Sequence, residues 1–194
     1  METRDYTNLK GSSRVYSEES KKIFAIINQH CALVEKAGCD EGFMNVTPEV
    51  DKMFKELQRE SSFSAEEWGS DTYFMGFRGL KDNSEIPSGR FSPSEECDIK
   101  LLLACKIAKE TRDHILRELG YKASAGISHN KTVAKLGSGF NKPNAQTVTP
   151  IRYLKSALEN VEVAKIRFCG GKVSESLLRY GIHTMGELQG RDAE

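Results

Sequence analysis

The alternation of apolar and polar positions predicts a helix and then a β-hairpin in the first fifty residues. Residues 17–30 carry Ile and Phe at the spacing of one helical face, and the Ser17 hydroxyl can accept from the first-turn amides as an N-cap. Residues 32–37 and 39–47 have the short apolar runs of strands, close enough to pair around residues 36–38. The helix is therefore expected to pack on a small sheet.

A long helix and a third strand follow. Residues 94–119 place apolar side chains at helical spacing, which predicts a helix of about 25 residues with one buried face. Gly120 suits the left-handed position that ends a helix. Residues 123–128, ASAGIS, are typical of a strand. Because strands and helices alternate, we expect an α/β or α+β layered domain.

Two other stretches differ from this pattern. Residues 59–93 are rich in Ser, Gly and charged residues around one apolar cluster at 73–77, so we expect a long surface excursion anchored at a single point. After Pro150 the strand signals give way to short helical patterns. We therefore expect two domains, residues 1–150 and residues 151–194, of which the second is small and entirely helical.

Composition limits the classes of protein. Of the 194 residues, 38% are hydrophobic, which is enough for a globular core. No apolar run approaches the roughly 20 residues that cross a bilayer, and the N-terminal residues lack a secretory signal, so we expect a cytosolic or nuclear protein. The five cysteines have no CxxC spacing, which argues against a zinc site or a disulfide framework and indicates reduced, mostly buried thiols.

The net charge of zero conceals a basic segment. Residues 122–172 hold nine Lys or Arg against two Glu, a net charge of +7, whereas residues 1–121 hold 17 Lys or Arg against 22 Asp or Glu, a net charge of −5. A basic surface attracts phosphate, which makes a nucleic acid or a nucleotide a candidate ligand. The alternative is an ordinary solvated face, and charge alone does not decide between the two.

Asp40 and Glu41 are adjacent carboxylates inside the second predicted strand. A half-buried acid is costly unless it is ion-paired, protonated or bound to a metal. Adjacent strand residues point to opposite faces, so the simpler interpretation is one solvated acid beside one salt-bridged acid. Mg²⁺ is commonly held by one or two carboxylates together with substrate phosphates, so the pair is also a candidate half-site for Mg²⁺.

A short helix is predicted at the start of the basic segment. Ser128 or Asn130 can cap it, which places Lys131 and Lys135 one turn apart on the same helical face. The two lysines are candidates for phosphate contacts, and the alternative is that both are solvated surface residues.

A turn follows that helix. Gly137 and Gly139 are expected to end the helix, and the sequence NKPN at 141–144 has the composition of a turn. The turn presents Lys142 as a fixed point cation, which suits a triphosphate.

A glycine pair at the start of a later helical pattern is a further candidate site. The backbone amides of Gly170 and Gly171, with the side chain of Lys172, can hold a phosphate of a DNA backbone without reading any base. A plain turn is the alternative for such a glycine pair.

Three segments together resemble the Y-family of translesion DNA polymerases. They are VEKAGCDEGFMNVT, SAGISHNKTVAKLGSGFNKPNAQTVTP and KIRFCGGKVSESLLRYGIHTMGEL, in this order. The resemblance implies an α+β fold, in which a palm with a mixed or antiparallel sheet and packed helices precedes the start of a helical thumb. It also implies template-directed DNA synthesis past damaged bases, in DNA repair and in the nucleus.

The resemblance implies specific ligands. It assigns Asp40 and Glu41, as catalytic residues, to a pair of Mg²⁺ ions for which Mn²⁺ can substitute, and Lys142 to the incoming deoxynucleoside triphosphate. Primer-template DNA is the other implied substrate, with Lys131 and Lys135 among its candidate contacts. A sliding clamp is an implied partner through regions outside this sequence, and no membrane is expected.

The resemblance leaves two classes of function open. Family members begin with a strand that carries a further metal-binding aspartate and continue through a fingers domain, so this chain is expected to be truncated and inactive alone. The first class is the palm and early thumb of a polymerase that uses two metal ions. The second is a non-catalytic module, derived from such a polymerase, that binds DNA backbone or has a regulatory role.

Overall fold

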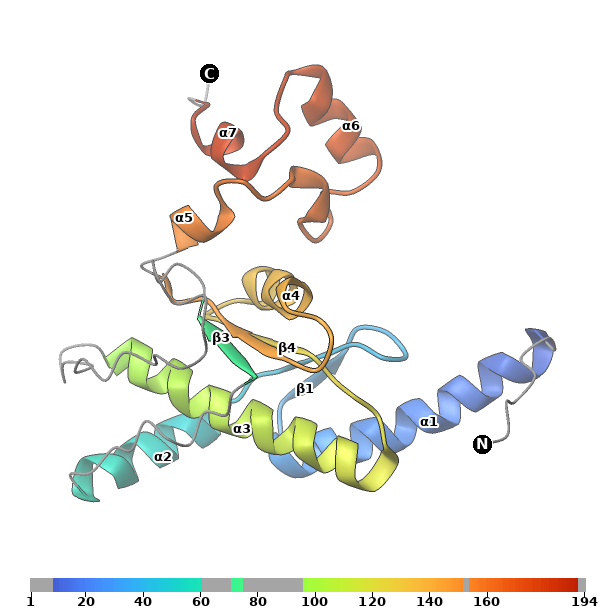
Figure 1. Ribbon diagram of the computed structural model, residues 1–194, viewed down its shortest axis with the longest axis vertical. Helices are drawn as coiled ribbons and strands as arrows, with labels where there is room; N and C mark the ends of the chain where they lie inside the picture. Colours follow the sequence, from blue (N-terminus) through green and yellow to red (C-terminus); the bar gives the residue numbers. More distant parts are fainter. Residues whose placement is uncertain (1–8, 61–70, 75–95, 152–153, 192–194) are drawn as a thin grey trace.

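The computed structural model describes residues 9–60, 71–74, 96–151 and 154–191, and its elements lie in layers (Figure 1). The helices are α1 (Leu9–His30), α2 (Thr47–Glu60), α3 (Glu96–Leu119), α4 (Lys131–Phe140), α5 (Leu154–Leu158), α6 (Lys172–Arg179) and α7 (Met185–Gln189), with a 3-10 turn at Val163–Lys165. The strands are β1 (Val34–Lys36), β2 (Gly42–Met44), β3 (Thr72–Phe74), β4 (Ala125–Ile127) and β5 (Gln146–Val148).

The described strands form two sheets. β1 and β2 make an antiparallel hairpin in which Glu35 lies opposite Phe43. β3, β5 and β4 make a parallel sheet in this order, with the buried β5 in the centre. Because small sheets and packed helices occur together, the expected α+β class is confirmed.

The main core lies between the parallel sheet and α3. Leu102 and Cys105 of α3 are almost fully buried and belong to one apolar cluster with Ile127 of β4, Val148 of β5 and Val50 of α2. Helix α4 covers the opposite face of the sheet, while α1 and α2 lie on the far side of α3 (Figure 1). The sheet is therefore enclosed between helices, and α3 is in turn covered by two more.

The long predicted helix and the third strand are confirmed, but the predicted start of the first helix is wrong. α3 ends as expected before Gly120, which has φ 73°. Helix α1 begins at Leu9, so Ser17 lies inside the helix and is not its cap. Most residues of the extra turns are polar or glycine, and an Arg14–Glu18 ion pair one helical turn apart supports them. Apolar periodicity gives no signal for such turns.

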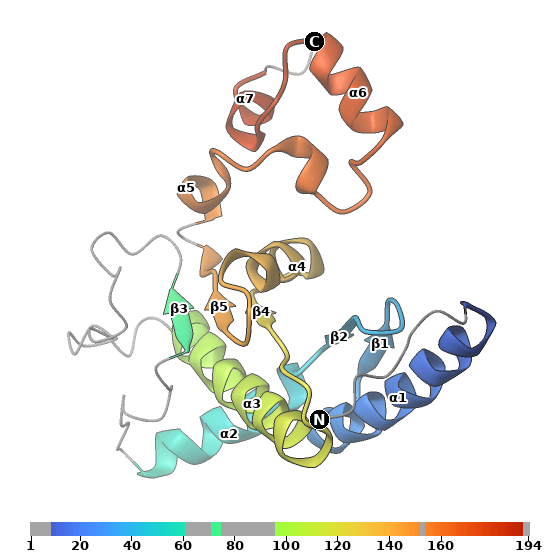
Figure 2. The same ribbon diagram turned by 45° about the vertical axis from the view of Figure 1, so that its right-hand side comes forward.

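Helix α4 runs through both glycines that were expected to end it, and it packs against β4 (Figure 2). A Cβ atom on Gly126 would lie 1.8 Å from the Ala134 carbonyl oxygen and 2.5 Å from the Ser138 nitrogen. A Cβ atom on Gly137 would lie 3.4 Å from the Gly126 Cα atom. Gly126 and Gly137 therefore serve the close approach of a helix to a strand and not the end of the helix.

Two elements were not predicted, and the predicted excursion at residues 59–93 lies only partly within the described residues. Helix α2 and the central strand β5 were missed, the latter because all three of its residues are buried and show no alternation. The apolar cluster at 73–77 includes the end of β3, an edge strand of the parallel sheet, which agrees with an anchor for the excursion at 59–93. Residues 61–70 and 75–95 of that excursion lie outside the described residues.

The described elements after residue 150 are helical, as the pattern indicates. Leu158 and Val161 form an apolar cluster with Val133 and Leu136 of α4, so these helices pack on α4. Helix α7 begins with a capping box between Thr184 and Glu187. The division of the chain into two domains remains a prediction.

The five cysteines are free thiols, as expected, but the expectation that most are buried is wrong. Cys31 and Cys105 are buried, Cys169 is half-buried, and Cys39 and Cys97 are exposed. In the part of the chain that the structure describes, the helices lack the combination of length and apolarity that spanning a membrane requires.

The close packing between α4 and β4 can be tested by replacing Gly126 and Gly139 with alanine, one at a time. Gly126→Ala places a methyl group against backbone atoms that cannot move away, so we expect a loss of about 2–4 kcal/mol in the free energy of unfolding. Gly139 lies in the helix that packs on Gly126 but has open space around it, so Gly139→Ala is expected to stabilise by about 0.5–1 kcal/mol. Urea unfolding of both variants measures the difference, and equal stability would contradict the packing.

A pair of histidines joins α1 to α3. The ring nitrogens His30 Nε2 and His114 Nδ1 are 2.9 Å apart, so a single proton can be shared between them. Burial lowers the pKa of His30, and the neighbouring His114 and Arg117 lower it further, against an opposing effect of Glu110. The folded chain therefore favours the neutral form of His30.

Because of the lowered pKa of His30, we expect the folded chain to lose stability in mild acid. Below the unfolded pKa of about 6.5 the unfolded chain binds more protons than the folded chain, so the free energy of unfolding should fall as the pH falls. His114→Gln removes the neighbouring ring that helps to lower the pKa of His30, so it should flatten the dependence between pH 8 and pH 5. His183→Gln, an exposed control, should retain it. The same slope in wild type and His114→Gln by urea unfolding would contradict this account.

Candidate functional site

Asp40 and Glu41 lie in the loop of the β1–β2 hairpin and not within a strand, which corrects the sequence prediction. The amides of Ala37 and Gly38 both donate to the Glu41 carbonyl oxygen, at 2.9 and 3.1 Å, and close the loop. Gly, Cys and Asp at 38–40 have the composition of a turn, which ends β1 before the two acids. Both acids are exposed, so neither carries the burial cost expected of a strand position.

Because Asp40 and Glu41 lie in a loop, the argument that their side chains must point to opposite faces of a sheet no longer applies. In a strand, side chains of adjacent residues point to opposite faces, but this alternation does not apply to a loop. The Asp40 carboxylate accepts from the Cys39 thiol at 3.6 Å, and the Glu41 carboxylate lies beside Lys135 of α4.

The lysines of α4 face the hairpin. Lys131 donates to Glu35 of β1, and Lys135 donates to Glu41 of the loop. Because the two lysines are one helical turn apart, α4 presents both to the hairpin at once. The hydrogen bond from Lys131 lowers the pKa of Glu35, and the charges of Lys131 and Arg167 lower it further. Of the two caps that the sequence left open, Ser128 and Asn130, it is Asn130 that caps α4, by accepting from the Val133 amide at 2.9 Å.

The segment between the 3-10 turn and α6 also touches the hairpin. The guanidinium carbon of Arg167 lies 4.8 Å from the centre of the Phe43 ring and 4.7 Å from the centre of the Phe168 ring. The Lys131 ammonium lies 5.7 Å from the same Phe43 ring. A stack of cations and aromatic rings therefore connects the hairpin, α4 and the segment before α6.

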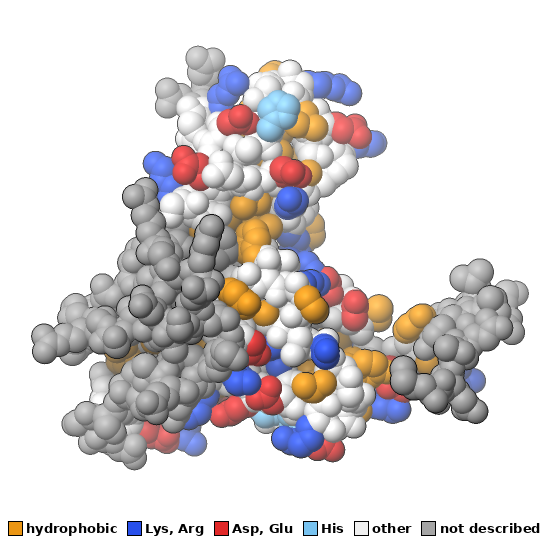
Figure 3. All heavy atoms as spheres, viewed as in Figure 1, with side chains coloured by type: hydrophobic (Ala, Val, Ile, Leu, Met, Phe, Trp, Pro, Cys, Tyr) orange, Lys and Arg blue, Asp and Glu red, His pale blue; other side chains and the backbone are white. Residues whose placement is uncertain are grey.

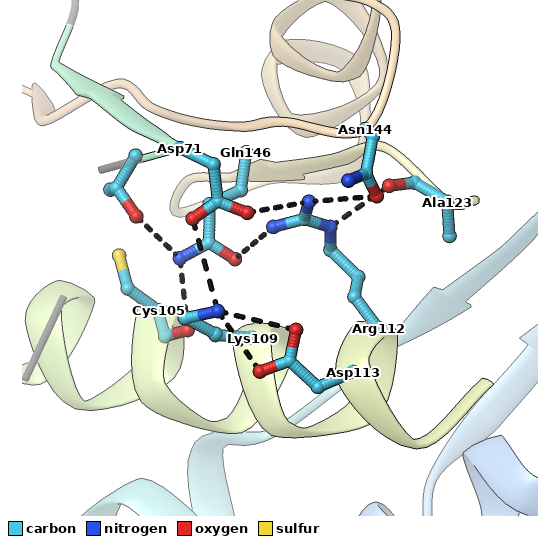
Figure 4. Close-up of polar contacts among 9 residues, drawn as sticks. Asp71, Cys105, Lys109, Arg112, Asp113, Ala123, Asn144 and Gln146 are labelled. Atoms are coloured by element: carbon cyan, nitrogen blue, oxygen red, sulfur yellow. Dashed lines mark hydrogen bonds and ion pairs between the residues drawn. The ribbon is translucent and has the colours of Figure 1, made fainter. Parts of the chain in front are cut away.

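Lys142 is exposed in the turn that follows α4. From Lys135 to Phe140, the last residue of α4, is about 8 Å along the helix axis. The carboxylate loop and the Lys142 turn are thus attached to one short helix. Asn141 and Asn144, on either side of Lys142, make side-chain hydrogen bonds to Thr147 and Arg112, respectively (Figure 4 shows the second).

Gly170, Gly171 and Lys172 are exposed at the start of α6. Gly171 is the N-cap residue with φ 58° and ψ −126°, a conformation that needs glycine. The Ser174 hydroxyl donates to the Gly171 carbonyl oxygen at 2.9 Å and fixes the first turn of α6.

The donor set of the loop suits a hard cation as part of a site. Within the described residues, no group of three or more His, Cys, Asp or Glu side chains is placed to hold a metal ion. Asp40 and Glu41 provide carboxylate oxygens, which Mg²⁺ prefers, and both are accessible. The loop therefore fits a half-site that needs ligand oxygens from elsewhere, such as phosphates.

The basic segment does not form a uniform basic surface on the face seen in Figure 3. Acidic and basic side chains are interspersed there, and hydrophobic side chains gather where the C-terminal helices meet the rest of the chain. Ion pairs contribute to this mixture, since Lys131, Lys135 and Lys165, three of the nine basic residues, each lie beside a glutamate.

Sequence reasoning missed three residues of this region. Glu35 and Arg167 interact with residues far away in the sequence, so no local spacing indicated them. Arg112 was hidden in a helix predicted for its apolar face, although a charged residue near that face is a signal that a buried partner exists.

The sequence model of the impB/mucB/samB family matches residues 3–139. DNA polymerase eta of Drosophila melanogaster is 29% identical over 92% of this chain and 22% of its own length. DNA polymerase eta of Arabidopsis thaliana is 30% identical over 92% of this chain and 27% of its own length. DNA polymerase iota of Homo sapiens is 30% identical over 90% of this chain and 22% of its own length. The chain thus spans about a quarter or less of these relatives.

Proposed function

The chain belongs to the impB/mucB/samB family, the Y-family of DNA polymerases, and we propose that it supplies the metal- and triphosphate-binding part of an eta-like translesion polymerase. The family is one of DNA-directed DNA polymerases, which confirms the resemblance seen in the sequence. The proposed reaction is template-directed nucleotidyl transfer past damaged bases. Primer-template DNA and a deoxynucleoside triphosphate are the proposed substrates.

One observation carries the proposal. The Asp40–Glu41 loop lies against α4 through the Lys135–Glu41 ion pair, and the same helix leads directly into the Lys142 turn. Carboxylates in a loop that is paired with this helix, and a cation in the turn that follows the helix, are the groups that a metal-bound triphosphate needs. The helix sets the spacing between them.

Each residue has a distinct proposed role. Asp40 and Glu41 hold the divalent ions, and Lys142 binds the charge of the triphosphate. When bound, such ions lower the pKa of an attacking hydroxyl and neutralise charge on the phosphates. Lys135, now paired with Glu41, lies where it can exchange that partner for a phosphate oxygen. The chain itself contributes position and charge.

DNA contacts are proposed at two places. Lys131 and Lys135 lie beside the carboxylate loop, and Gly170, Gly171 and Lys172 lie at the exposed start of α6, where amides can meet a phosphate. Both places contact backbone and not base edges, so no sequence preference is expected. A nuclear location is proposed, because the eukaryotic relatives named above are DNA polymerases.

The proposal predicts that metal and nucleotide bind cooperatively to this chain. Mn²⁺ should bind weakly alone, because the described residues offer two carboxylates and no third ligand, and at least about tenfold more tightly with dATP present, because phosphates complete the shell. Asp40→Asn should abolish the gain. Electron paramagnetic resonance of free Mn²⁺ measures the affinity.

The control is Asp51→Asn, because Asp51 is an acid of α2 that pairs with Lys100 in another part of the fold. This variant should keep the full gain in Mn²⁺ affinity. A gain that survives in Asp40→Asn would overturn the assignment of the loop. Retained salt-dependent DNA binding in that case would favour the non-catalytic module instead.

A further inference from the structure

The turn that carries Lys142 is tied down on both sides by other elements. Before it, the Asn141 side-chain amide donates to the Thr147 hydroxyl of β5 at 3.0 Å. After it, the Asn144 side-chain oxygen accepts from Arg112 of α3 at 3.4 Å. Lys142 and Pro143 between them are exposed. Lys142 therefore lies in a short turn whose two ends are hydrogen-bonded to the sheet and to α3.

Arg112 is held in one orientation by four partners (Figure 4). Besides Asn144, its Nη2 donates to Asp71 Oδ2 at 2.8 Å, its Nη1 to Gln146 Oε1 at 3.3 Å, and its Nε to the Ala123 carbonyl oxygen at 2.9 Å. The Arg112 side chain is only 5% exposed. The fixed guanidinium restrains the residues that it contacts. It joins α3 to the segments just before β3, β4 and β5.

Asn144 takes a conformation that most residues avoid. Its φ is 54°, in the left-handed region, which asparagine tolerates better than other residues with a side chain. Glycine would satisfy this backbone conformation equally well, but it would lose the contact with Arg112. The asparagine side chain therefore adds a specific contact to a turn whose backbone does not require it.

We propose that Arg112 and Asn144 are positioning residues for Lys142, which hold the lysine turn in the place where it meets the triphosphate. This inference rests on the proposed function, because it takes Lys142 as the triphosphate ligand. A lysine stem is flexible, and fixing the backbone that carries it lowers the ordering cost when the phosphate binds. Arg112 is buried, so it acts on the lysine turn through Asn144 and not by contact with the triphosphate.

The test measures the affinity of the full chain for Mg·dATP by calorimetry. Asn144→Gly keeps the backbone conformation and removes the contact, and it should weaken binding about three- to tenfold, the effect of one lost hydrogen bond. Arg112→Lys, which cannot make all four contacts, should weaken it at least as much. Asn160→Gly, at an exposed asparagine just after α5, is the matched control and should leave the affinity unchanged.

Measuring Asn144→Gly in a chain that also carries Lys142→Ala separates a positioning role of Asn144 from a general effect on stability. If Asn144 acts through Lys142, then Asn144→Gly should have no further effect on Mg·dATP affinity in a chain that already carries Lys142→Ala. A purely structural role would lower the affinity equally in both backgrounds. Because Arg112→Lys can disturb the buried network, the result with Asn144→Gly decides.

The outcomes separate this inference from the proposed function. If Lys142→Ala weakens Mg·dATP binding and Asn144→Gly does not, the positioning role is wrong and the proposed function stands. Equal losses from Asn144→Gly with and without Lys142 also overturn the positioning role. If wild type does not bind Mg·dATP, or Lys142→Ala binds it as wild type does, Lys142 is not the triphosphate ligand and both proposals fall.

Discussion

The close packing of α4 on β4 is the contact on which the candidate site depends. Gly126 has no Cβ because the Ala134 carbonyl oxygen occupies that space, so helix and strand approach more closely than side chains would allow. With the helix fixed at this depth, Lys131 and Lys135 face the hairpin, Val133 and Leu136 face the C-terminal helices, and the NKPN turn leaves from the end of the helix. One helix thus fixes the positions of three parts of the chain.

Electrostatics attaches the hairpin to this helix. The two Lys–Glu pairs are exposed, and exposed pairs contribute little to stability because water and salt screen them. Their weakness is compatible with a binding role, since a glutamate held only by an exposed lysine can change partners at small cost. The polar contacts around Arg112 are different, because the arginine is buried and a partner lost from a buried charge is costly.

The sequence predicted the parts of the fold that have a local signal. Helix α3, strand β4, the Asn130 cap and the Gly120 stop each follow from spacing or from a single residue type. The loop position of Asp40 and Glu41, and the passage of α4 through Gly137, did not follow. The hairpin loop depends on where β1 stops pairing, and the role of Gly137 depends on a strand ten residues away in the sequence. Both are tertiary constraints.

The same limit applies to the site. Lys142 and the two acids could be selected from residue type and family resemblance, whereas Glu35, Arg112 and Arg167 become visible only when distant segments are brought together. Strand β5 shows the difference well, because a three-residue buried strand has no alternation to detect.

The central claim is that the carboxylate loop and the Lys142 turn serve one ligand. Paramagnetic broadening of backbone amide signals by Mn²⁺ with dATP tests it most directly. We expect residues 37–42 and residues 141–144 to broaden together, and more strongly than residues of α1 or α2. Broadening of the loop without the turn, or broadening spread over other acidic parts of the chain, would contradict the claim.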